Sequence, residues 1–134
     1  MTRLSVKKKI RSKVEKTKTG FSVFALEYPV FTTGKTIAEL TKNLTEALNL
    51  YFEDDGIDVS EKDINLEIDI KQFFQHYRVI NARFLADRIG MNASLLSQYV
   101  QGRKKPSTLQ TQKILRGINE IGKELSDLRI VSRN

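Results

Sequence analysis

The chain of 134 residues contains no cysteine and no tryptophan, and it has only two prolines and one histidine. The absence of cysteine excludes disulfide bridges and zinc sites with thiolate ligands. It is compatible with a reducing compartment, so we expect a cytoplasmic protein. No apolar run approaches the ~20 residues that a membrane-spanning helix needs. The basic N-terminus also lacks the apolar core of a signal peptide. The composition therefore predicts a globular protein without a membrane partner, and no motif calls for a cofactor.

Positive and negative charges are distributed unevenly along the chain. Residues 1–20 carry eight Lys and Arg against one Glu, net +7, and residues 21–70 carry three Lys against eleven Asp and Glu, net −8. Residues 71–134 carry twelve Lys and Arg against four Asp and Glu, net +8. A basic C-terminal part suits a polyanion, whereas an acidic middle suits a different partner or plain solvation. This asymmetry predicts two domains, residues 1–70 and residues 71–134.

The first domain begins with three predicted strands. Apolar and polar residues alternate over residues 4–16, which favours a half-buried strand with a lysine-rich, solvated face. Contact of this basic arm with nucleic acid stays open as an alternative. A second strand is expected over residues 21–28, ended by Pro29, and a short third strand over residues 30–33. These segments predict an antiparallel start to a sheet.

A helix and a fourth strand complete this domain. Thr36 and Glu39 have the spacing of a capping box, and apolar residues at helical spacing continue from Ile37 to Tyr51. The acidic residues 53–58 do not match a calcium-binding loop, so we interpret them as solvated rather than as a metal site. Alternation over residues 64–70 then predicts a strand with one apolar side. The order βββαβ indicates an α+β module.

Residues 71–134 predict four or five helices and no strand. Aromatic residues suggest a short helix near Phe73, and a final helix is expected after Ser107, which forms a capping box with Gln110. Gly117 and Gly122 lie inside this last helix and cost roughly 1 kcal/mol each relative to alanine. We therefore expect the helix to kink or to end early. Its predicted apolar stripe consists of Leu115, Ile118, Ile121, Leu125 and Leu128.

The segment from Leu85 to Ser107 predicts two short helices joined by a tight turn. Gly90 suits the turn because it adopts positive φ without strain, and Asn92 is placed to cap the second helix. The second helix is expected to end at Gly102, directly before the basic residues 103–105. The apolar contacts between the helices are expected from Leu85, Ile89, Met91, Leu96 and Tyr99. A short helix with a polar face beside a basic loop suits the major groove of DNA.

This segment resembles the helix-turn-helix of lambda-repressor-like and Cro-like regulators, in which further helices precede and follow the pair. The alternative is an inert helical bundle, which rarely has a basic loop at the end of the second helix. Residues 1–70 resemble the HicB-type antitoxin domain, a degraded ribonuclease-H-like module. The resemblance is carried by Phe21-Ser-Val-Phe, Thr33-Gly-Lys-Thr36 and Glu39…Glu46-Ala-Leu48. Pro29-Val-Phe31 replaces the Pro-Gly-Cys-like turn that is frequent in that family.

The expected orientation of the second helix indicates which of its residues would contact DNA bases and which would contact phosphates. With Leu96 and Tyr99 facing the core, the outward residues are Ala93, Ser94, Ser97 and Gln98. Gln98 can pair with adenine, the serines can reach several base edges, and the alanine methyl can touch a thymine methyl. Phosphate contacts are expected from Asn92, Arg83, Arg103, Lys104 and Lys105. Simple solvation is the alternative for each cation.

The two resemblances together imply an antitoxin that is also a repressor. It would silence a small HicA-type ribonuclease toxin, bind a palindromic operator to repress its own operon, and act as a dimer or higher oligomer. The alternative is a repressor of the same DNA-binding class whose N-terminal module only dimerises or senses a ligand. We do not expect an enzyme, because His76 stands alone in an aromatic-rich segment. Ribonuclease-H chemistry needs converging carboxylates, and the strands offer only Glu15, Glu27, Glu67 and Asp69.

Overall fold

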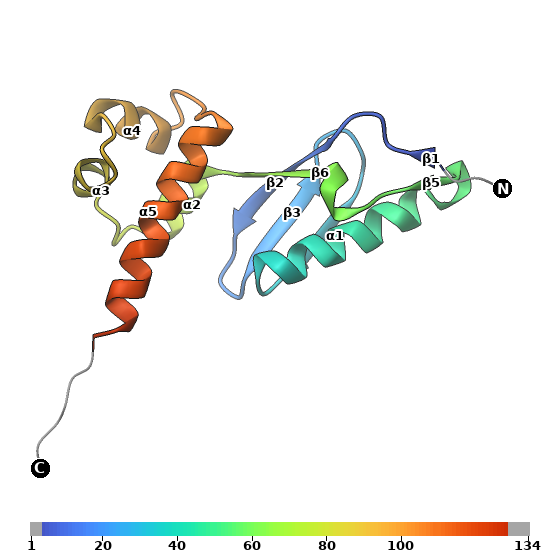
Figure 1. The fold of residues 1–134 in the computed structure, drawn as a ribbon, viewed down its shortest axis with the longest axis horizontal. Helices are drawn as coiled ribbons and strands as arrows, with labels where there is room; N and C mark the ends of the chain where they lie inside the picture. Colours follow the sequence, from blue (N-terminus) through green and yellow to red (C-terminus); the bar gives the residue numbers. More distant parts are fainter. Residues whose placement is uncertain (1–3, 129–134) are drawn as a thin grey trace, which may run out of the picture. The chain divides into compact units, whose positions relative to one another are not determined.

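The computed structural model of the protein describes residues 4–128 and contains both sheets and helices (Figure 1). The chain divides into two compact units, Met1–His76 and Tyr77–Asn134. All strands of the described residues belong to the first unit, and the second unit is helical. The fold class is therefore mixed α and β, with the two kinds of element segregated along the chain as in α+β proteins.

The first unit is built on a four-stranded sheet in the order β4-β3-β2-β6. The strands are β2 (Ile10–Lys16), β3 (Phe21–Ala25), β4 (Phe31–Gly34) and β6 (Ile64–Ile68). Neighbours β2, β3 and β4 pair antiparallel, as predicted, whereas β6 pairs parallel with β2. A parallel neighbour requires a crossover connection, and helix α1 (Ile37–Tyr51) lies in that connection. The predicted order βββαβ is thus present in this sheet.

Helix α1 packs on one face of the sheet. Every second residue of β2 is buried, Ile10, Ser12 and Val14, so this strand has one inward side. The helix buries Leu40, Leu44 and Leu48 completely, which lie four residues apart on one stripe. Its N-terminus is capped as expected, because Thr36 Oγ1 accepts a hydrogen bond from the Glu39 backbone N–H at 3.1 Å. The core of this unit lies between α1 and the sheet.

A side chain of α1 forms a hydrogen bond with the edge strand of this sheet. Strand β4 is terminal in the sheet, and the amide of Asn43 donates to the Thr33 backbone carbonyl at 2.8 Å. On the same strand, Phe31 keeps 64% of its surface exposed. The edge strand thus combines an occupied carbonyl with an exposed aromatic ring.

The N-terminal segment differs from the single strand predicted over residues 4–16. The pairing breaks into β1 (Leu4–Ser5) and β2, and the lysines 7–9 lie between the two strands. Strand β1 pairs parallel with β5 (Ile57–Asp58), which lies inside the acidic segment 53–58, where no strand was predicted. Gly56 makes this possible with a left-handed backbone, φ 66°, and its carbonyl accepts the Leu4 N–H at 2.8 Å. The predicted second strand also ends early, at Ala25, because the chain bends before Pro29.

The boundary between the units lies after His76, not after residue 70 as expected. Helix α2 (Ile70–His76) packs against β2 and belongs to the first unit. The amide of Gln72 accepts from the Lys16 N–H at 2.8 Å and donates to the Lys16 carbonyl at 2.7 Å. This side chain continues the pairing along β2 past the last residue pair with β6, Val14 and Ile68, and so attaches α2 to the sheet.

The second unit contains the helices α3 (Ala82–Ile89), α4 (Ala93–Val100) and α5 (Thr108–Ser126). Each begins at a polar residue that accepts a backbone N–H, namely Asn81, Asn92 and Ser107. Gly90 joins α3 to α4 with φ 68°, as predicted for the turn. The buried side chains are Leu85, Ala86, Met91, Leu96, Tyr99 and Ile114, while the predicted contact residue Ile89 is half-buried.

Helix α5 runs through both glycines to Ser126, so the early end, one of the two expected outcomes, does not occur. Its buried residues are Ile114 and Gly117, whereas Leu125 and Leu128 of the predicted stripe are exposed. A Cβ atom at Gly117 would overlap the γ2 methyl of Ile89 and lie 3.4 Å from Leu85 Cδ1. The missing side chain therefore lets α5 approach α3 closely, which accounts for a glycine inside a helix.

We expect Gly117→Ala to lower the free energy of unfolding by up to about 2 kcal/mol. Overpacking costs about 1–3 kcal/mol, and the stiff, β-branched Ile89 has little freedom to move aside; the gain in helix propensity is about 1 kcal/mol. Gly122→Ala is the matched control, because nothing lies within 4 Å of its Cβ position, and it should stabilise by about 0.5–1 kcal/mol. Urea denaturation measures both. Equal stabilisation by the two alanines would contradict the close approach.

Candidate nucleic-acid interface

The position of α4 is determined by the turn before it. The N–H of Met91 donates to the Ala86 carbonyl at 2.9 Å, which closes the end of α3 around Gly90. Asn92 then caps α4, because its Oδ1 accepts the Leu95 N–H at 3.1 Å. The Asn92 side-chain oxygen is thus occupied by the helix, and its Nδ2 is the group left for a phosphate.

Burial sets the rotation of α4 as the sequence predicts. Leu96 is fully buried and Tyr99 is 7% exposed. Ala93 and Ser94 are exposed, and Ser97 and Gln98 are half-buried. The residues expected to point outward therefore lie on the face opposite the core.

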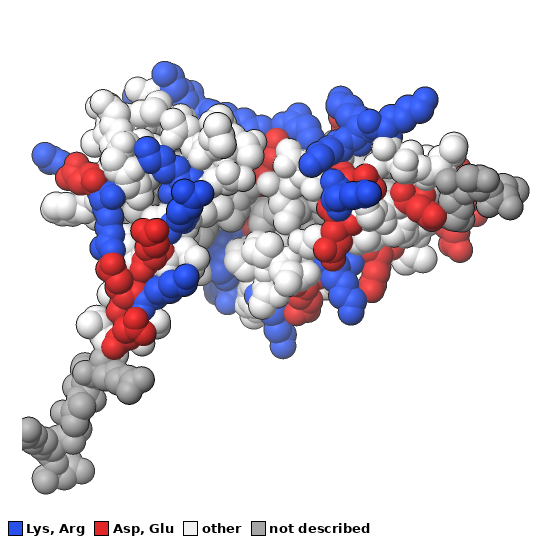
Figure 2. All heavy atoms as spheres, in the orientation of Figure 1, with Lys and Arg blue, Asp and Glu red and all other residues white. Residues whose placement is uncertain are grey.

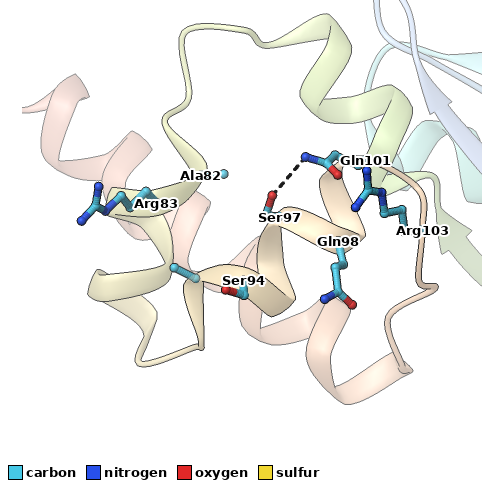
Figure 3. Close-up of a pocket in the computed structure, with 8 residues that line it drawn as sticks. Ala82, Arg83, Ser94, Ser97, Gln98, Gln101 and Arg103 are labelled. Carbon is cyan, nitrogen blue, oxygen red and sulfur yellow. Dashed lines mark hydrogen bonds between the residues drawn. The ribbon is translucent and has the colours of Figure 1, made fainter.

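A hollow of about 470 Å³ lies over this outward face (Figure 3). Its lining contains six of the nine predicted site residues: Arg83 from α3, Ala93, Ser94, Ser97 and Gln98 from α4, and Arg103. Asn92, Lys104 and Lys105 are exposed but do not line it. The structure therefore brings the predicted base-contacting residues together with two of the predicted phosphate contacts.

Two lining residues, Ala82 and Gln101, were not predicted. Gln101 ends α4, and its Nε2 donates to Ser97 Oγ at 3.2 Å. Its spacing, four residues after Ser97 and three after Gln98, places it on the same helical face. That spacing was available in the sequence, whereas nothing in the chemistry of Ala82 singles it out.

The hollow is electrostatically positive. Two arginines line it and no carboxylate does. Among the described residues, the guanidinium groups of Arg83 and Arg103 have no ion-pair partner. Arg88 on α3 is different, because Glu124 holds it in an ion pair and the hydrogen bond to that carboxylate raises the pKa of the guanidinium. Arg88 therefore ties α3 to α5 while Arg83 stays free to meet an anion.

The basic segment begins directly at the end of α4. The Gln98 carbonyl accepts the backbone N–H of Arg103 at 2.9 Å and that of Lys104 at 3.3 Å. Gly102 permits this reversal with φ 77°. The three cations at 103–105 are thus attached to the helix whose side chains line the hollow.

Three carboxylates of the first unit form ion pairs with basic residues near the N-terminus. Glu67 pairs with Arg11 and Asp69 with Lys13, each at 3.2 Å, and Glu27 lies 3.8 Å from Lys8. Over residues 4–128, no three His, Asp or Glu side chains converge where a metal ion could bind. Asp63 has a pKa below its usual value because the Ser60 backbone N–H donates to its carboxylate.

Within residues 4–128, no helix combines the length and apolar character needed to cross a bilayer.

Comparison of the chain with models of known protein families and with curated proteins gave no match.

We expect Asn92→Ala to lower the free energy of unfolding by about 1 kcal/mol, because the N-terminus of α4 loses its cap. Asn92→Ser keeps a capping oxygen and should restore most of the stability. Asn119→Ala, on an exposed position of α5, controls for the loss of an asparagine. Thermal unfolding followed by circular dichroism measures all three. A loss shared by Asn92→Ser would contradict a capping role.

Proposed function

We propose that the second unit binds DNA by inserting α4 into the major groove, as a helix-turn-helix of the lambda-repressor-like and Cro-like class does. The observation that carries this proposal is the hollow over α4, whose lining contains two serines, two glutamines and two arginines and no carboxylate. In the part of the chain that the structure describes, neither arginine has an ion-pair partner. Such a set offers hydrogen bonds to base edges and positive charge to phosphates. The basic residues 103–105 extend the positive charge beyond the helix.

The outward residues of α4 are assigned to base reading. Gln98 pairs with an adenine through its amide, Ser94 and Ser97 reach neighbouring base edges, and the Ala93 methyl contacts a thymine methyl. The backbone contacts come from Asn92, Arg83 and the cations at 103–105. Specificity therefore depends on α4, and affinity depends mainly on the basic segment.

A pair of such units would read a palindromic operator. Each α4 presents only a few base contacts, so a dimer or higher oligomer supplies the second half-site. The half-sites are then expected about 34–36 Å apart, or a multiple of that distance. Binding to DNA upstream of its own gene would make the protein a repressor of its own operon.

For the first unit we propose the role of an antitoxin domain of the HicB type. The proposal is supported by the βββαβ order and by the exposed carboxylates of Glu53, Asp54, Asp55, Asp58 and Glu61. Figure 2 shows Asp and Glu side chains interspersed with Lys and Arg over the viewed face of the molecule. An acidic segment can cover the basic, RNA-binding surface of a small ribonuclease toxin of the HicA type. The protein would then have two partners, a toxin and operator DNA.

One observation favours the alternative in which the first unit senses a ligand. A hollow of about 290 Å³ lies beside the lysines 7–9, with Tyr28, Phe52 and Ile57 among its other lining residues. The lining combines apolar side chains with three lysines and one carboxylate, Glu27, which pairs with Lys8 at 3.8 Å, so its net charge is positive and suits a small anion. A repressor that releases its operator when such a compound is added, and that has no protein partner, would support this alternative over the antitoxin.

Two substitutions should separate base reading from phosphate binding. Gln98→Ala is expected to cost about 1–3 kcal/mol on the operator and to relax the preference at one base pair. Lys104→Ala should weaken binding to all sequences alike and reduce the slope of log K against log salt by about 1. Fluorescence anisotropy with upstream and random DNA at several salt concentrations measures both. Equal losses of Gln98→Ala on the two DNAs would remove its reading role.

The antitoxin role is tested by co-expression with a neighbouring open reading frame that encodes a short, basic protein. We expect the two proteins to co-purify and the full chain to abolish RNA cleavage by the partner. Asp54→Lys combined with Asp55→Lys should weaken this complex at least tenfold, because like charges then face each other. Asp127→Lys reverses an exposed charge at the end of α5 and should leave the complex unchanged. Unaltered binding by the double variant would exclude the acidic segment from the interface.

A further inference from the structure

Gln101 is attached to Ser97 through both its backbone and its side chain. The Gln101 backbone N–H donates to the Ser97 carbonyl at 2.9 Å, and its Nε2 donates to Ser97 Oγ at 3.2 Å. Figure 3 shows this contact, while the side chain of Gln98 points in a different direction. The Ser97 and Gln101 side chains thus form a pair within the lining of the hollow.

The contact decides which hydrogen bond Ser97 can still make. A hydroxyl group has one proton to donate and two lone pairs that accept. An amide nitrogen has no lone pair to offer, so Gln101 donates and Ser97 Oγ accepts. The contact leaves the Ser97 proton unused.

The Ser97 proton is also not taken up by its own helix. Hydroxyls inside helices frequently donate to the carbonyl four residues earlier, as Thr41 and Thr45 do in α1 at 2.8 and 2.7 Å. Among the described residues, no such bond joins Ser97 to Ala93. The Ser97 hydroxyl can therefore donate its proton to a ligand. The side-chain oxygen of Gln101, Oε1, is an acceptor beside it.

We propose that Gln101 is a specificity-determining residue that holds Ser97 as a donor, so that the two side chains present one donor and one acceptor to a single adenine. The proposal rests on the proposed DNA binding of α4. In the major groove adenine shows the N7 acceptor beside the N6 donor, whereas guanine shows two acceptors, N7 and O6. The Ser97 hydroxyl serves N7 of either purine, but the Gln101 oxygen accepts from N6 and opposes O6. The pair thus selects adenine over guanine at one position, separate from the base read by Gln98.

A double-mutant cycle tests this pair with the full-length chain and its upstream DNA. The variants are Ser97→Ala, Gln101→Ala and the combination, and each is measured on the operator and on versions with single adenines changed to guanine. Each single variant should weaken operator binding about tenfold, in the range of one good base contact, and should lose the adenine preference at the same position. The combined variant should be no more than about twofold worse than either single variant, because the pair acts as one unit.

Gln112→Ala is the matched control, since Gln112 is an exposed glutamine of α5 outside the hollow, and it should leave Kd and base preference unchanged. Circular dichroism of every variant checks that α4 is intact. Two results would contradict the proposed Ser97–Gln101 pair: affinity losses that multiply in the combined variant, or an adenine preference that survives Gln101→Ala. The proposed DNA binding by α4 would be unaffected as long as the wild-type protein still recognises the operator. A wild-type protein that binds upstream and random DNA equally would overturn the proposed function itself, and the pair with it.

Discussion

The burial of Leu96 and Tyr99 is the constraint on which the candidate interface depends. These two side chains hold α4 at one rotation, and a helix turned by one residue would bring about 100° of different surface outward. Leu96 is fully buried, so a rotation of α4 about its axis would expose this apolar side chain to water. The serines and glutamines then share one exposed face, and the basic segment leaves the helix at a defined point, where the Gln98 carbonyl binds it. Packing inside the second unit thus determines which polar side chains of α4 are exposed at its surface.

Local patterns predicted the main helices and the strands of the four-stranded sheet, and long-range contacts account for most of the differences. The caps at Thr36, Asn92 and Ser107 depend on neighbours within three residues, and each was predictable from the sequence. The pairing of Leu4 with Ile57 was not, because two-residue strands far apart in the sequence carry no periodic signal. The attachment of α2 to the first unit includes two hydrogen bonds of the Gln72 amide, which a sequence pattern does not reveal.

The site shows the same division between local and distant information. The inward and outward faces of α4 follow from helical periodicity, and the structure has them as predicted. Gln101 belongs to the same periodicity, although the predicted outward residues include none after Gln98. Gly117 was predicted to weaken α5, because helix propensity is a property of the chain alone. Its use becomes visible only when Ile89 of a different helix is placed beside it.

The side chain of Asn43 has a consequence for the solubility of the first unit. Edge strands with free backbone groups are templates for strands of other chains, and exposed aromatic rings strengthen such pairing. Strand β4 is an edge and exposes Phe31, yet the amide of Asn43 occupies its Thr33 carbonyl. A strand arriving from a second molecule would have to displace this amide or share the Thr33 carbonyl with it, since a carbonyl oxygen has two lone pairs. The helix that forms the core thus also places a competing donor on the edge where growth into aggregates would begin.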